Sequence, residues 1–157
     1  MEKISEQKSP EIHLHKATLE DLKTFVELEK GVDGPKTYSA MTDEEEAKGE
    51  LANSTVYLIE SGGEVVGSIM YERKSDSHVY ISGLAIRPER QGSGVGRAVL
   101  EQVLKEIGDV ERIDLVTHPE NEKAIRLYTS LGFHIESEKE DYFGDGETRV
   151  VMSKLKK

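Results

Sequence analysis

The chain contains no cysteine in its 157 residues. It can therefore form no disulfide, no thiolate metal site and no covalent intermediate on a cysteine. It also lacks an apolar run as long as a membrane span, and this absence predicts no membrane partner. Residues 1–10 are polar and mixed in charge, without the apolar core of a signal peptide, and are predicted to form a flexible tail. Together these absences predict a cytoplasmic protein.

Positive charge is also scarce. Aspartate and glutamate number 31 against 21 lysines and arginines, which gives a net charge of −10. Because nucleic-acid binding depends on basic side chains that neutralise phosphates, we expect no nucleic-acid partner. The densest acidic stretches are Glu44–Glu46 and residues 136–147. They are interpreted either as solvated helix and loop faces or as a surface that attracts a cationic ligand.

The length predicts one domain, over residues 11–157, with a proper hydrophobic core. Alternating patterns predict strands, and 3.6-residue patterns between capping signals predict helices. The expected strands are 11–15, 55–60, 64–72, 79–86, 112–117, 134–142 and 148–155. The expected helices are 18–29, one that opens at 42, 95–107 and 121–131. Hairpins combined with a crossover helix favour an α/β (α+β) fold with a mixed sheet and helices on both faces.

A glycine-rich turn, Arg87-Pro-Glu-Arg-Gln-Gly-Ser-Gly-Val-Gly-Arg97, follows the strand expected at 79–86 and opens the helix expected at 95–107. Backbone N–H groups and the dipole at a helix start favour an anion, and glycines allow a phosphate to approach closely. Three arginines frame the turn, so we expect a phosphate site. Arg97-Ala98 after the last glycine argues against a nucleotide-hydrolysing P-loop, and the glycine spacing does not match a dinucleotide fingerprint.

A second block, residues 119–133, has the features of a capped helix. Asn121 is a suitable N-cap, and Ala124, Tyr128 and Leu131 fall on one face of the helix that follows. Gly132 stands where a left-handed residue would end that helix. Taken alone, Tyr128 would be interpreted as a half-buried aromatic residue near the helix end.

The two blocks together, Gln91-x-x-Gly94-x-Gly96 and Asn121-x-x-Ala124-x-x-x-Tyr128 followed by Gly132-Phe133, resemble the GNAT superfamily of acetyl-CoA-dependent N-acetyltransferases. The resemblance implies a single, mostly antiparallel sheet of about seven strands, in which the fourth and fifth splay apart. It implies that acetyl-CoA is the co-substrate and that its pantetheine arm bonds to the backbone of the fourth strand. The residues implied in acetyl-CoA binding are Leu84, Ala85, Ile86, Gln91, Gly92, Ser93, Gly94, Val95, Gly96, Arg97, Asn121 and Tyr128.

The resemblance also implies the chemistry: direct transfer of the acetyl group to a primary amine in a ternary complex. Tyr128 matches the tyrosine that donates a proton to the CoA thiolate. The general base is left open. Val116 stands where some relatives that modify protein N-termini carry Glu or His, so His118 and Tyr80 are the candidates, and a third option is that no dedicated base exists.

The acceptor side is predicted to be shaped by residues 31–50 and by the hairpin 134–147. Asp141–Glu147 resembles the hairpin of ribosomal-protein and peptide N-terminal acetyltransferases, which favours a peptide α-amine, whereas a polyamine or an amino acid fits the acidic surface equally well. The alternative function is a catalytically silent acyl-CoA-binding sensor or scaffold. The scattered histidines predict no metal site, and the oligomeric state is open between monomer and homodimer.

Overall fold

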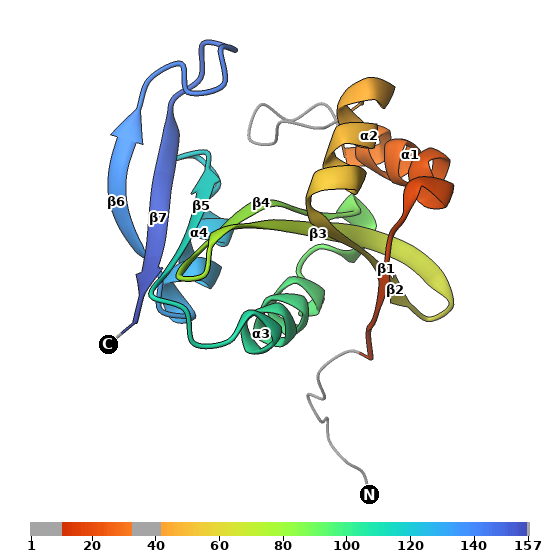
Figure 1. The fold of residues 1–157 in the computed structure, drawn as a ribbon, viewed down its shortest axis with the longest axis horizontal. Helices are drawn as coiled ribbons and strands as arrows, with labels where there is room; N and C mark the ends of the chain where they lie inside the picture. The colour runs from red at the N-terminus through yellow and green to blue at the C-terminus, as the bar shows by residue number, and fades with distance from the viewer. Residues whose placement is uncertain (1–10, 33–41, 157) are drawn as a thin grey trace, which may run out of the picture.

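The computed structural model describes residues 11–32 and 42–156, and in it a seven-stranded sheet runs in the order β1-β2-β3-β4-β5-β7-β6 (Figure 1). The strands are β1 (His13–Lys16), β2 (Thr55–Ser61), β3 (Glu64–Ser75), β4 (His78–Ile86), β5 (Arg112–Thr117), β6 (His134–Lys139) and β7 (Arg149–Leu155). The neighbours β4 and β5 are parallel, and every other adjacent pair is antiparallel. The mixed, mostly antiparallel sheet predicted from the sequence is therefore confirmed.

Two layers of helices cover this sheet. The helices are α1 (Leu22–Val32), α2 (Glu44–Asn53), α3 (Val95–Ile107) and α4 (Glu122–Ser130). Figure 1 shows α1 and α2 on one side of β4, together with the loop that joins β6 to β7, and α3 and α4 on the other side. Each layer has its own core. One is centred on Phe25 and Leu28 of α1, and the larger one includes Val99 and Val103 of α3.

The order of elements agrees with the sequence prediction, and the differences lie at their ends. The first helix is preceded by a short 3₁₀ turn, Leu19–Asp21, which the Thr18 capping box organises. The strand expected at 134–142 is shorter than predicted, because β6 ends at Lys139. Asp141 has a positive φ of 51° and its carboxylate accepts the N–H of Gly146 at 2.7 Å, so the chain turns there instead of extending. The predicted tail, 1–10, lies outside the described residues.

Two features of β4 bear on the site. Ser82 is an extra residue in the pairing with β3, because Met70 pairs with Gly83 and Tyr71 pairs with Ile81. An extra residue of this kind is a β-bulge, which bends the strand locally. The pairing with β5 runs from His78 opposite Arg112 to Ile81 opposite Leu115 and stops there. The two parallel strands therefore part beyond these residues, as the predicted splay requires.

Candidate acetyl-CoA site

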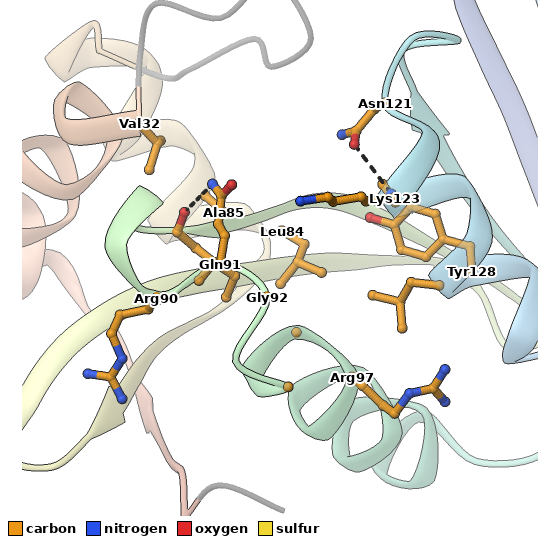
Figure 2. Close-up of a pocket in the computed structure, with 15 residues that line it drawn as sticks. Val32, Leu84, Ala85, Arg90, Gln91, Gly92, Arg97, Asn121, Lys123 and Tyr128 are labelled. Atoms are coloured by element: carbon orange, nitrogen blue, oxygen red, sulfur yellow. Dashed lines mark hydrogen bonds between the residues drawn. The ribbon is translucent and has the colours of Figure 1, made fainter.

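A cavity of about 420 Å³ lies where β4 ends, beside the turn into α3 and the first turns of α4 (Figure 2). Ten of the twelve residues predicted to bind acetyl-CoA line it, and Ser93 and Val95 do not. The Ser93 hydroxyl donates to the carbonyl of Arg90 at 2.5 Å, and Val95 is buried in the core. The lining residues are Val32, Leu84, Ala85, Ile86, Arg90, Gln91, Gly92, Gly94, Gly96, Arg97, Asn121, Lys123, Ala124, Leu127 and Tyr128.

The glycine-rich turn has the backbone geometry expected of an anion cradle. Gly92 and Gly94 have φ values of 79° and 90°, a region that favours glycine. Gly94 is the N-cap of α3, so no side chain covers the first N–H groups of that helix from the cap position. Gln91 donates from its amide to the carbonyl of Ile86 at 2.9 Å, which ties the turn to the end of β4 (Figure 2). These N–H groups can receive a phosphate.

The three arginines of the turn do not all face the cavity. Arg87 donates from Nε to the carbonyl of Val65 at 2.9 Å and does not line the cavity. Arg90 lines it, but its guanidinium reaches Ser61 at 3.0 Å, and Figure 2 shows it directed away from the other lining residues. Arg97 donates to the hydroxyl of Ser130 at 2.6 Å. The helix N-terminus and the glycine backbone therefore form most of the candidate anion site.

The opposite wall of the cavity comes from α4. The Asn121 carboxamide accepts the N–H of Ala124 at 3.3 Å, which confirms it as the N-cap, and Gly132 has the positive φ expected after the helix. The ring of Tyr128 is buried and meets the ring of Phe133 edge-on, with centroids 5.9 Å apart. Burial raises the pKa of Tyr128 to about 12, so its hydroxyl stays protonated at neutral pH and can donate a proton.

Lys123 is a lining residue that the sequence argument missed. It lies in the first turn of α4, next to the cap, and Figure 2 shows its side chain extending from α4 toward β4, alongside the hydroxyl end of Tyr128. Its place could have been anticipated, since Lys123 and Leu127 are four residues apart on one helix face, and Leu127 also lines the cavity. The place of Val32, at the end of α1, could not have been anticipated, because it depends on tertiary packing.

Tyr80 does not line this cavity. It pairs with Asp114 across β4 and β5, and Lys74 stands 5.6 Å from its ring centroid. Burial raises the pKa of Tyr80 to about 12, with further contributions from Tyr142, Glu50, Asp114 and Glu72. A phenol held neutral in this way can donate a hydrogen bond, but it is poorly suited to accept a proton as a base.

His118, the other candidate base, does not line the cavity either. It follows the last residue of β5 and is buried, and both ring nitrogens have partners. The backbone N–H of Glu120 donates to Nδ1 at 3.0 Å, and Nε2 lies 2.7 Å from a carboxylate oxygen of Glu147. Its backbone carbonyl accepts the N–H of Asn121 at 2.9 Å. The chain thus links His118 to the cavity wall through Asn121.

Among residues 11–32 and 42–156, no group of three or more His, Cys, Asp or Glu side chains is placed to hold a metal ion. No helix in the described part of the chain is long and apolar enough to cross a membrane. Of the two segments predicted to shape the acceptor side, 31–50 is described only in part, because residues 33–41 fall outside the described ranges.

Solved structures with the same architecture include N-acetyltransferases. The ribosomal-protein-S18-alanine N-acetyltransferase from Escherichia coli superposes with a TM-score of 0.77 at 20% identity, covering 92% of this chain and 94% of the other. A spermidine N-acetyltransferase chimera from Vibrio cholerae SpeG and hSSAT gives a TM-score of 0.75 at 19% identity, covering 92% and 95%. At these identities the likeness shows the fold, which is that of the GNAT acyl-CoA N-acyltransferases.

The family follows from the sequence match. A model of the acetyltransferase (GNAT) family matches residues 19–133, well over half of the chain, so the chain belongs to this family. Members of the family use acetyl-CoA as co-substrate, so the match supports the predicted enzyme class. A mycothiol acetyltransferase from Kineococcus radiotolerans is 45% identical over 51 residues, 32% of this chain and 17% of the relative. The chain spans a fifth or less of the length of the curated relatives that it matches.

Proposed function

We propose that the protein transfers the acetyl group of acetyl-CoA directly to a primary amine, in a ternary complex. The observation that carries this proposal is a single cavity that combines the end of the splayed strand β4, the glycine turn before α3, and Asn121 and Tyr128 of α4. Holding two reactants in one geometry removes much of the entropic barrier to their reaction. The cytoplasmic location and the choice between monomer and homodimer stay predictions.

The chemistry assigns roles to the parts of the cavity. The turn from Gln91 to Arg97 and the N-terminus of α3 would bind the pyrophosphate, and the backbone of Leu84 to Ile86 would bind the pantetheine arm. A backbone N–H of β4 would stabilise the oxyanion as the amine nitrogen attacks the thioester carbonyl. The C–S bond then breaks, and the protonated hydroxyl of Tyr128 would donate to the departing thiolate.

For the acceptor we propose a cationic amine, either a peptide N-terminal α-amine or a small amine such as a polyamine or an amino acid. The face of β4 that carries Tyr80 supports a cationic ligand. The carboxylate of Glu50 of α2 accepts from the Ser82 hydroxyl at 3.0 Å and acts electrostatically on Tyr80. The named activities of the two solved structures, on a ribosomal protein and on spermidine, correspond to the two main options.

The test is free-thiol release from acetyl-CoA across a panel of polyamines, amino acids, aminoglycosides and short peptides with free N-termini. Turnover on one class would support the proposed transfer and name its acceptor. In parallel, acetyl-CoA at about a hundred times its Kd should add about 2.7 kcal/mol to the free energy of unfolding. Stabilisation by acetyl-CoA without turnover on any amine would favour the alternative, a silent acyl-CoA-binding sensor. The absence of both stabilisation and turnover would contradict the proposal that the cavity binds acetyl-CoA.

A further inference from the structure

The buried ring of His118 has a defined tautomer. A backbone N–H can only donate, so the bond from Glu120 at 3.0 Å requires a lone pair on Nδ1. The ring proton of the neutral imidazole must then sit on Nε2, which donates it to the carboxylate of Glu147 at 2.7 Å. The lone pair on Nδ1 of His118 is therefore occupied by the bond from Glu120. His118 cannot take up a proton from a substrate there without losing that bond.

The carboxylate that receives this bond belongs to the loop between β6 and β7. The Glu147 side chain keeps 33% of its surface exposed, whereas that of His118 keeps 3%. Asp145 of the same loop is bonded to Arg149, the first residue of β7. The Asp145 carboxylate accepts a hydrogen bond from the guanidinium of Arg149 at 2.9 Å and another from the backbone N–H of Glu147 at 3.0 Å. One carboxylate oxygen of Glu147 is thus fixed by His118 in a side chain that solvent or a ligand can still reach.

The Glu147–His118 pair stands at the end of β5 that adjoins the cavity. Thr117, the last residue of β5, pairs with Val150, so the start of β7 and the loop before it lie beside this end. The carbonyl of His118 accepts the N–H of Asn121, which lines the cavity. The same loop also carries Tyr142, which acts electrostatically on Tyr80 of β4. The pair is therefore joined to the wall of the acetyl-CoA cavity at Asn121, and it belongs to the hairpin that is proposed to shape the acceptor side.

We propose that Glu147, oriented by His118, is the base that accepts the proton of the acceptor ammonium, a role that rests on the proposed acetyl transfer. The ammonium gives one proton to the Glu147 carboxylate, which passes it to solvent. The free amine nitrogen then forms a bond to the thioester carbon, and the C–S bond breaks. The second nitrogen proton replaces the one that Tyr128 donates to the thiolate. The products are the acetamide, CoA thiol and one released proton.

This role predicts a defect that depends on the acceptor. At pH 7 about one α-amine in ten is already unprotonated, but only about one lysine-like amine in 2,500. Glu147→Gln keeps an oxygen that can accept from His118 but removes the base. Its kcat/KM relative to wild type should therefore fall up to about tenfold with trialanine and up to about 2,500-fold with spermidine as acceptors. With trialanine, the ratio should return toward one as the pH rises from 6.5 to 9.5.

Two controls separate this role from a structural one. Glu111→Gln makes the same charge change at an exposed position before the other end of β5, and its ratio to wild type should stay near one at every pH. Glu147→Ala should recover activity when formate is added, because formate supplies the missing carboxylate. Melting temperatures of all variants show whether they are folded.

The outcomes separate the two proposals. If wild type acetylates only one of the two acceptors, the role of Glu147 is tested with that acceptor alone. The measurement is then the pH dependence of kcat/KM for Glu147→Gln relative to wild type. A ratio that is the same at every pH, together with no rescue by formate, would overturn the role of Glu147 while leaving the transfer intact. If wild type acetylates neither trialanine nor spermidine nor any amine of the panel, the proposed transfer fails, and the role of Glu147 fails with it.

Discussion

At the scale of single residues, Tyr128 combines a buried ring with a position on the cavity wall. Its pKa of about 12 comes from burial, so the proton is present at any pH at which the protein would work. A thiol has a pKa of about 8.5, so the CoA thiolate is already a fair leaving group and needs only modest help. As the proposed proton donor, the Tyr128 hydroxyl should therefore make a contribution that is small for a general acid.

We expect Tyr128→Phe to lower kcat roughly a hundredfold, the bottom of the range for general acid catalysis, with little change in acetyl-CoA affinity. The measurement is thiol release under saturating acetyl-CoA, together with calorimetric binding. Tyr57→Phe is a matched control, because Tyr57 of β2 does not line the cavity and the hydroxyl that is deleted donates to Glu106 at 2.8 Å. It should cost stability, about 0.5–1.5 kcal/mol, but not rate. An unchanged rate in Tyr128→Phe would contradict the proton-donor role.

At the scale of elements, the distance between β3 and β4 is set by a glycine. A Cβ placed on Gly67 of β3 would lie 2.2 Å from the carbonyl oxygen of Ala85, and backbone cannot move aside as a flexible side chain can. Ala85 lines the cavity, so the same contact fixes the strand that is proposed to bind the pantetheine arm. Packing and the proposed ligand binding should therefore be coupled at this position.

We expect Gly67→Ala to destabilise the fold by about 1–3 kcal/mol, as overpacking does, and to weaken acetyl-CoA binding because β4 must shift. Denaturant unfolding and calorimetry measure the two effects. Gly49→Ala is the control: it lies within α2 with nothing within 4 Å of the added Cβ, and it should gain about 1 kcal/mol without changing acetyl-CoA affinity. Equal acetyl-CoA affinity in Gly67→Ala and wild type would show that the β3–β4 spacing does not control the site.

The elements and the turn could be predicted because their causes are local. The cap at Asn121, the glycines of the turn and the apolar stripe of α3 each act within a few residues along the chain, and the structure keeps all of them. The partner of His118 could not be predicted in this way. Glu147 is 29 residues further along the chain and reaches it only because β5 and β7 pair in one particular register.

The arginines of the turn illustrate the same limit. Their sequence positions predict a cationic frame for a phosphate, but a guanidinium takes the nearest acceptor that the fold presents. For Arg87 this acceptor is a carbonyl of β3, and for Arg97 it is a serine of α4. Neither contact follows from the local sequence, since each depends on which element packs beside the turn.

At the scale of the whole molecule, four tyrosines make the stability of the fold depend on pH in the alkaline range. The pKa values of Tyr57, Tyr71, Tyr80 and Tyr128 are each raised to about 12, with burial as the largest cause. Tyr57 and Tyr71 also donate to the carboxylate of Glu106 on α3, which favours their protonated forms further. In the unfolded chain a tyrosine loses its proton near pH 10. Between pH 10 and about 12 the unfolded state therefore binds fewer protons than the folded state.

The sign of the effect follows from this difference. When the unfolded state binds fewer protons, the free energy of unfolding falls as the pH rises, so stability present below pH 10 should be lost between pH 10 and 12. A buried tyrosine such as Tyr71 or Tyr128 adds up to about 1.4 kcal/mol per pH unit to this slope.

Urea unfolding at half-unit steps from pH 8.5 to 11.5 measures this slope. Tyr71→Phe should be less stable than wild type at pH 8.5 because it loses the bond to Glu106, yet its stability should fall less steeply above pH 10. Equal slopes above pH 10 would mean that the Tyr71 hydroxyl titrates alike in the folded and unfolded states, and that its burial against Glu106 does not hold the proton.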